Sequence, residues 1–146
     1  MESTLGKLTK AMARHGVVAW GIAPPGPHEV PEAVSLWFSG AMQGKMDYLQ
    51  QHLSLKVSAG NVLEGARAVI SAALPYGLAG AVDGVPWPVA GYAWGVDYHL
   101  RVQETLTAVA RECLPQGSFR VVVDSAPIPE RYVAVLAGVG FVGKSG

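Results

Sequence analysis

The spacing of apolar residues along the chain switches between helical and strand periods. The first run predicts a helix that Ser3 or Thr4 can cap and that Gly16 can end. Its apolar positions recur at intervals of three or four residues and comprise Leu5, Leu8 and Met12. We therefore expect a helix of about three turns at the start of the chain.

Three later apolar runs have the length of buried strands. The run 17–23 (VVAWGIA) is followed by the breaker-rich segment PPGPHEVP, and the run 66–76 (ARAVISAALPY) by a long segment rich in glycine and proline. The third run, 119–124 (FRVVVD), is β-branched and stops at Asp124. Each run predicts a strand.

Amphipathic patterns predict three further helices, and a short helix is also expected within 45–53. Pro31 opens the first of the three, Asp97 can cap the second, and Pro129 opens the third. Their apolar faces comprise Val34, Trp37, Phe38, Ala41 and Met42 in the first, Leu106, Val109, Ala110 and Cys113 in the second, and Tyr132, Val133, Leu136 and Ala137 in the third.

The alternation of helices and strands predicts an α+β fold in which helices cover a mixed sheet. The pattern alone leaves open whether that sheet is parallel or mixed. A length of 146 residues fits a single domain, 1–146. The connection 77–91 (GLAGAVDGVPWPVAG) is long and rich in glycine and proline, so we expect it to be functional or mobile and not regular.

Composition narrows the classes of function. Half of the residues are hydrophobic, 15% are charged and the net charge is zero, so any contact with nucleic acid must be local. A single cysteine, Cys113, excludes an internal disulfide and a cluster held by several cysteines, and it fits a cytoplasmic protein. Neither a leader nor a membrane span is expected.

The histidines give no metal site by their spacing. His15, His28 and His52 are expected at the surface, and His99 has no second histidine or carboxylate at metal-ligand spacing. Glu130 and Arg131 are expected to pair locally or to cap the last helix. We therefore predict no metal bound by this chain's own side chains.

The segment 138–145 (GVGFVGKS) matches the phosphate-binding pattern G-x-x-x-x-G-K-[ST]. That loop works only between a preceding strand and a following helix, with an acid further along to help hold magnesium. The 146 residues supply neither the helix nor the acid after the motif. We expect no nucleotide hydrolysis here, and the overlapping match to G-x-G-x-x-G fails for the same reason.

Three stretches together resemble the epoxyqueuosine reductase family in order and spacing. They are KMDYL at 45–49, YAWGVDYH at 92–99, and VDSAPIPER with AGVGFVGKS within 123–145. The resemblance runs over nearly the whole chain and corresponds to the cobalamin-binding N-terminal region of the family. It implies a nitroreductase-like α+β core and reduction of the epoxide of epoxyqueuosine in tRNA to queuosine.

The resemblance also implies a cofactor set. Base-off cobalamin is expected in this domain, and electrons are expected from two [4Fe–4S] clusters. Since each cluster takes four thiolates, the clusters are expected on a ferredoxin-like domain or partner protein and not on this sequence. The chain departs from the family at Gly91 and Val96, where arginines are common, at 55–61 (LKVSAGN), and at Ser145, where asparagine is usual.

By the resemblance, Asp124 donates a proton to the epoxide oxygen. Ring opening leaves an alkoxide unless a proton arrives, and an acid in a desolvated site can stay protonated near neutral pH. The alternative from the residues alone is a turn aspartate that accepts backbone hydrogen bonds.

Two further groups are candidates for cofactor binding. The aromatic and polar cluster of Tyr92, Trp94, Tyr98 and His99 suits a flat corrin ring with amide fringes, or else forms ordinary core or interface. The tail residues Gly143, Lys144 and Ser145 offer amides, an ammonium and a hydroxyl to a phosphate or nucleotide tail, or else form a frayed terminus. The alternative function is a non-catalytic module that binds a corrinoid or docks on a partner.

Overall fold

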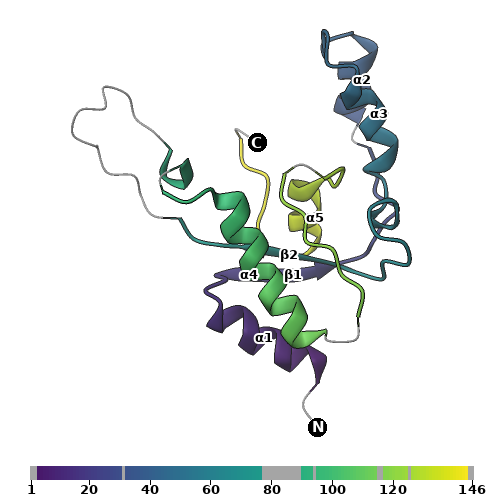
Figure 1. Cartoon of the computed structure of the whole chain (residues 1–146). Coiled ribbons are helices and arrows are strands. Elements are labelled where there is room, and N and C mark those ends of the chain that lie inside the picture. The colour runs from purple at the N-terminus through teal and green to yellow at the C-terminus, as the bar shows by residue number, and fades with distance from the viewer. Residues whose placement is uncertain are drawn as a thin grey trace, which may run out of the picture. The chain divides into compact units, whose positions relative to one another are not determined.

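The computed structural model describes residues 3–30, 32–76, 90–93, 95–114, 117–124 and 126–144. The chain forms two compact units, whose elements are labelled in Figure 1. The first unit comprises Met1–Ala19 and Ala72–Val123, and the second comprises Trp20–Ser71 and Asp124–Gly146. Each unit is therefore built from segments that are distant in the sequence.

In the first unit, helix α1 (Thr4–Arg14) packs against helix α4 (Tyr98–Cys113). The predicted caps are confirmed, because Ser3 Oγ accepts a hydrogen bond from the Gly6 amide at 3.1 Å and the Asp97 carboxylate accepts one from the His99 amide at 2.9 Å. The buried residues of the two helices are Leu8, Ala11, Met12, Val109 and Cys113. Leu5, expected on the apolar face, is instead 56% exposed.

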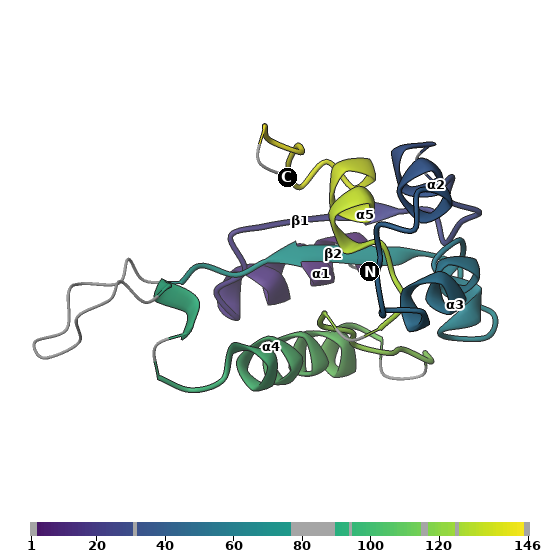
Figure 2. The same cartoon turned by 90° about the horizontal axis from the view of Figure 1, so that it is seen from above.

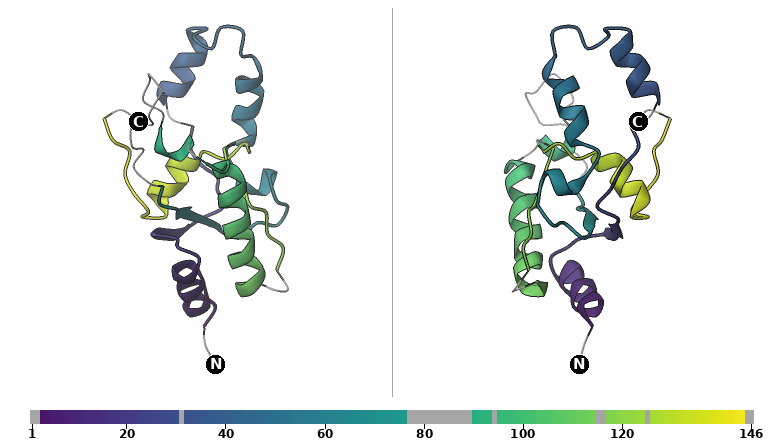
Figure 3. Two further views of the ribbon diagram at one scale, coloured as in Figure 1. Left: turned by 60° about the vertical axis from the view of Figure 1, so that its left-hand side comes forward. Right: turned by 90° about the vertical axis from the view of Figure 1, so that its right-hand side faces the viewer.

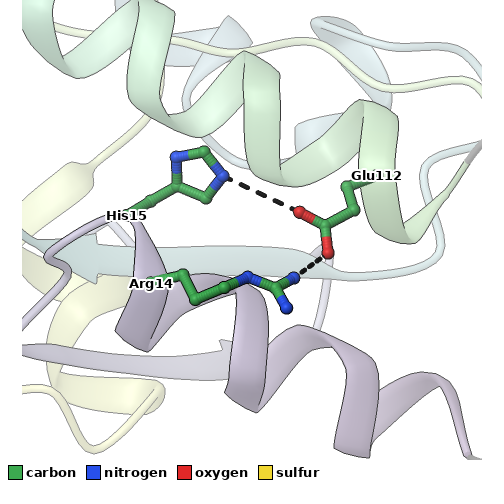
Figure 4. Close-up of polar contacts among 3 residues, drawn as sticks. All are labelled: Arg14, His15 and Glu112. Atoms are coloured by element: carbon green, nitrogen blue, oxygen red, sulfur yellow. Dashed lines mark hydrogen bonds and ion pairs between the residues drawn. The ribbon is translucent and has the colours of Figure 1, made fainter.

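A small group of charges also joins these two helices. Arg14, in the last turn of α1, pairs with Glu112 of α4, and His15 Nε2 lies 3.7 Å from the other oxygen of the same carboxylate (Figure 4). All three side chains are partly exposed, so such pairs contribute at most about 1 kcal/mol each. The apolar contacts of α1 and α4 dominate this interface.

The second unit contains helices α2 (Glu32–Ser39), α3 (Tyr48–Leu55) and α5 (Glu130–Leu136) and a 3-10 turn at Ala59–Asn61 (Figure 3). The predicted extension of α2 to Met42 is wrong. The helix ends at Ser39, Ala41 has a positive φ of 52°, and Met42 is 68% exposed. Leu136, expected on the inner face of α5, is 43% exposed, whereas Val133 is buried.

The sheet consists of strands β1 (Ala19–Ala23) and β2 (Val69–Ala73), which pair with each other (Figure 2). The Val18 amide, just before β1, donates to the Ala73 carbonyl at the end of β2 at 2.9 Å, so the strands run antiparallel. Most residues of both strands are half-buried. The apolar runs predicted buried strands, so fewer residues are fully buried than expected.

Two predictions about the sheet are wrong. Residues 119–124 are not a strand, and within the described ranges the sheet has two antiparallel strands, so it is not mixed. A β-branched run favours extended backbone, but a strand exists only where a partner supplies the ladder of hydrogen bonds. The α+β class is confirmed in its simpler form, helices with a small sheet.

In the part of the chain that the structure describes, every helix is too short or too polar to cross a lipid bilayer.

Candidate functional site

A cavity of about 1000 Å³ lies within the second unit. This volume lies at the upper end of the range typical of small-molecule sites, about 300–1,000 Å³. Its apolar walls come mainly from α2, α3 and α5, and Glu29, Asp124 and Glu130 contribute carboxyl groups. The apolar lining includes Val34, Trp37, Phe38, Leu49, Leu53, Ile128 and Val135.

Asp124 lies at this cavity in an unusual backbone conformation. Its φ is +54°, in the left-handed region that non-glycine residues seldom adopt. The Asp124 amide donates to Glu130 Oε1 at 2.9 Å, which ties this bend to the first residue of α5. Asp124 is therefore held by a turn and a side chain, and not by the end of a strand as the sequence predicted.

Glu130 is the residue that sequence reasoning undervalued. Burial raises the pKa of its carboxyl above the usual value, and the charge and side-chain hydrogen bond of Asp124 raise it further. The Asp124 amide and the charge of Lys56 act in the opposite direction. Glu130 follows Asp124 by six residues, and Pro127 and Pro129 lie between them. This spacing was the available sign that the chain turns back and brings Glu130 to Asp124.

His28 also lines the cavity, and the prediction that it lies at the surface is wrong. The residue is only 5% exposed, and its ring meets Tyr132 of α5 edge to face at a centroid distance of 5.7 Å. Among the described residues, no hydrogen-bond partner reaches its buried Nε2. No periodic pattern of apolar residues indicated this burial, because His28 lies in an irregular segment.

The backbone around His28 explains how an irregular segment stays in place. The His28 amide donates to the Val57 carbonyl at 2.6 Å, and the Ala59 amide donates to the Pro25 carbonyl at 2.6 Å. Gly26 has a φ of +124°, and a Cβ there would lie 2.6 Å from the Val57 carbonyl oxygen. Only glycine permits both this φ and this close approach.

The candidate aromatic residues form a row in the first unit. Tyr92 meets Tyr76 edge to face at 6.0 Å and Tyr98 at 5.4 Å, and the ring of His99 stacks on Tyr98 at 4.0 Å. Tyr92 and Tyr76 are 48% and 63% exposed, so the row presents open aromatic surface. Trp94 lies outside the described residues. The structure thus brings Tyr92, Tyr98 and His99 together.

Asp97 connects this row to the start of α4. Its carboxylate accepts from the His99 amide and lies 2.8 Å from His99 Nδ1. The backbone hydrogen bond from His99, followed by the side-chain one, lowers the pKa of Asp97. An ionised Asp97 therefore caps the helix and orients the imidazole beside Tyr98.

The candidate tail residues Gly143 and Lys144 are exposed in the second unit, and Ser145 lies outside the described residues. Val142, directly before them, lines the cavity. The phosphate-loop pattern follows helix α5, which ends at Leu136, and not a strand. This context lacks the strand that a phosphate loop requires.

The described residues contain no group of three or more histidine, cysteine, aspartate or glutamate side chains placed to hold a metal ion. Cys113 is buried on α4.

The chain is similar in sequence to one family of known proteins. The family model described as "Epoxyqueuosine reductase QueG, DUF1730" matches residues 57–125. Epoxyqueuosine reductase of Leadbetterella byssophila is 32% identical over 75% of this chain and 37% of its own length. The Burkholderia pseudomallei protein of that name is 32% identical over 96% of this chain and 41% of its own length.

A solved structure is similar over almost the whole chain. The crystal structure of an epoxyqueuosine reductase with an epoxyqueuosine-modified tRNA-Tyr stem loop matches with a TM-score of 0.69 and 22% identity. The match covers 95% of this chain and 39% of that one. The chain thus spans about two fifths of the length of the relatives it matches and shares the fold of that part.

Proposed function

From the premise that this chain is related in sequence and fold to the epoxyqueuosine reductases, we propose that it forms their cobalamin-binding, proton-donating part. In this proposal residues 1–146 form one cobalamin-binding domain with a nitroreductase-like core, acting in the cytoplasm on tRNA that carries epoxyqueuosine. The observation that carries it is Asp124 at the cavity of the second unit, in the motif that the family resemblance marks for proton donation.

The residues present fit a corrinoid on chemical grounds. A corrin presents a broad apolar face and a fringe of amides. The row of Tyr76, Tyr92 and Tyr98, in which Tyr76 and Tyr92 are exposed and Tyr98 is half-buried, offers aromatic rings with phenol hydroxyls at their edges. When bound, reduced cobalamin supplies the electrons for epoxide reduction. Gly143, Lys144 and Ser145 are proposed to contact the nucleotide tail, and Trp94 and His99 to extend the aromatic contact.

The chain does not fit an iron–sulfur cluster. It has one cysteine, and that residue is buried, whereas each [4Fe–4S] cluster takes four thiolates. The electron donor is therefore proposed to be a further domain or a separate iron–sulfur protein.

Asp124 has the access that proton donation requires. Its side chain is exposed at a cavity whose walls are mainly apolar, so a bound substrate would replace water around the carboxyl group. Such desolvation favours the neutral acid, which is the form that donates. The left-handed φ and the bond to Glu130 restrict where this carboxyl can point.

The first test replaces Asp124 by asparagine, which keeps the size but cannot donate an acidic proton. The chain is loaded with cobalamin, reduced with a low-potential chemical reductant and given an epoxyqueuosine-modified tRNA stem loop. We expect Asp124→Asn to bind cobalamin as the wild type does and to lose turnover by about 10²-fold or more. Glu29→Gln, at an exposed acid of the same cavity, is the matched control and should keep turnover.

Undiminished turnover in Asp124→Asn would reject the acid role. Cobalamin binding by the wild type without any epoxide reduction would favour the alternative function, a corrinoid-binding or partner-docking module. That alternative draws on Gly91 and Val96, which stand where the family commonly has arginines.

A further inference from the structure

The reaction in the proposed function requires more protons than Asp124 can carry. Removing the oxygen of an epoxide to leave an alkene consumes two electrons and two protons and releases one water. One proton converts the ring-opened oxygen to a hydroxyl, and the second lets that hydroxyl leave as water. A single carboxylic acid holds one proton, so a second source must lie within reach.

Glu130 is placed to be that source. Its Oε1 accepts the Asp124 amide at 2.9 Å, which fixes the two residues against each other across the turn. Both side chains line the same cavity, and Glu130 begins α5 while Asp124 occupies the left-handed bend. We propose that Glu130 holds the second proton and passes it to Asp124 after Asp124 has protonated the ring-opened oxygen.

This proton transfer rests on the proposed function. The protons and electrons of the epoxide reduction balance as follows. As the first C–O bond breaks, Asp124 forms the O–H bond and becomes a carboxylate. Glu130 then protonates that carboxylate, and Asp124 delivers this proton as the second C–O bond breaks and water leaves. The two electrons would come from the reduced corrinoid of the proposed function, and both carboxylates would recover protons from solvent. Glu130 is a positioning and proton-holding residue, since it acts through Asp124.

The surroundings of Glu130 favour its protonated form more than those of an exposed glutamate do. Burial raises the pKa of Glu130, and the adjacent Asp124 charge raises it further, because two carboxylates in contact resist being ionised together. The positive charge of Lys56 lowers the pKa of Glu130. The remaining titratable or charged groups around the cavity are His28, Glu29, Arg131 and Tyr132.

The variant Glu130→Gln separates proton holding from structure. The glutamine Oε1 can still accept the Asp124 amide, so the turn is kept, but the side chain carries no exchangeable acid proton. Glu130→Ala removes both the acceptor and the proton. Glu29→Gln is again the matched control, since it removes an exposed acid from the same cavity.

The first arm titrates the side-chain carboxyl carbons of the ligand-free chain by NMR. In the wild type we expect the Glu130 carboxyl to titrate at higher pH than an exposed glutamate, because burial and the adjacent Asp124 charge disfavour its ionisation. In Asp124→Asn, which removes the neighbouring charge, the Glu130 carboxyl should titrate at lower pH than in the wild type, and Glu29→Gln should leave its titration unchanged. Superimposable Glu130 curves in the wild type and Asp124→Asn would overturn the inference whether or not the chain is a reductase.

The second arm measures turnover against pH in the cobalamin-loaded chain. We expect Glu130→Gln to keep cobalamin affinity, to lose turnover by about 10²-fold, and to lose the wild-type decline that accompanies deprotonation of Glu130 as the pH rises. If the wild type is active and Glu130→Gln has the same turnover, the role of Glu130 is overturned and the proposed function is kept. An inactive wild type would instead overturn the proposed function, and the proton-transfer step with it.

Discussion

At the scale of single residues, the cavity of the second unit brings a buried histidine and two adjacent carboxyl groups to one apolar space. Asp124 could be singled out from its motif, because the need for an acid follows from the chemistry that the resemblance implies. Glu130 and His28 could not, because their properties arise from burial and from neighbours distant in the sequence. The second proton source is therefore visible only in three dimensions.

His28 provides a test of stability at this scale. A buried polar atom without a partner costs about 1–3 kcal/mol, and within the described residues Nε2 of His28 is such an atom. His28→Phe keeps the edge-to-face contact with Tyr132 and removes both ring nitrogens. We expect the free energy of unfolding in urea to stay the same or to rise by about 1 kcal/mol.

The matched control is His52→Phe. His52 meets Tyr48 edge to face at 5.9 Å, but it is less deeply buried than His28, so its replacement should change stability by less than about 0.5 kcal/mol. If His28→Phe lowers the free energy of unfolding while His52→Phe does not, the histidine nitrogens are stabilising and the reasoning fails.

At the scale of elements, β1 packs on the end of α5 at a glycine, Gly21, where no side chain separates the two backbones. Gly21 lies in β1, and a Cβ placed there would meet the Ala137 carbonyl oxygen at 1.9 Å and its carbon at 2.9 Å. These are backbone atoms, which cannot swing aside as a flexible side chain can. The apolar run 17–23 predicted the strand, but nothing in it identified Gly21 as the point of contact.

Gly21→Ala should therefore destabilise the chain. We expect a loss of at least about 1–3 kcal/mol in the free energy of unfolding, the usual cost of forcing atoms into a filled space. Urea unfolding followed by circular dichroism measures it. Gly140→Ala is the control, because a Cβ there meets nothing within 4 Å, and its effect should stay within about 0.5 kcal/mol. Equal stability of the two variants would contradict the close packing of β1 and α5.

At the scale of the whole molecule, the two units carry different parts of the proposed chemistry. The aromatic row lies in the first unit, and the carboxyl pair and its cavity lie in the second. The aromatic contact with the corrin and the proton transfer can therefore be tested by substitutions in different units, and a change in one should leave the other measurable.

Cobalamin binding is the test at this scale. We expect the purified chain to bind cobalamin with a change in its visible spectrum and to co-elute with it. Tyr92→Ala should weaken binding several-fold, since an aromatic contact is worth about 0.5–1.5 kcal/mol beyond its buried area. Tyr48→Ala, which removes a tyrosine of similar exposure from the second unit, should not weaken it. Absence of any spectral change with the wild type would remove the cofactor from the proposal.

Apolar spacing was sufficient to predict most helices, since a helix is stabilised by local hydrogen bonds and by caps such as Ser3 and Asp97 that lie within its own segment. It was also sufficient to predict β1 and β2. It failed at 119–124, because a strand depends on a partner that the local sequence does not contain.

The sequence by itself thus determined most of the helices and the α+β class, and it singled out Asp124 as a candidate residue. Tertiary structure alone decided that His28 is buried, that Glu130 meets Asp124, and that the sheet stops at two strands. The physical reason is the range of the interactions. Capping and helical periodicity act within a few residues, whereas burial, carboxyl coupling and strand pairing act between segments that only the fold brings into contact.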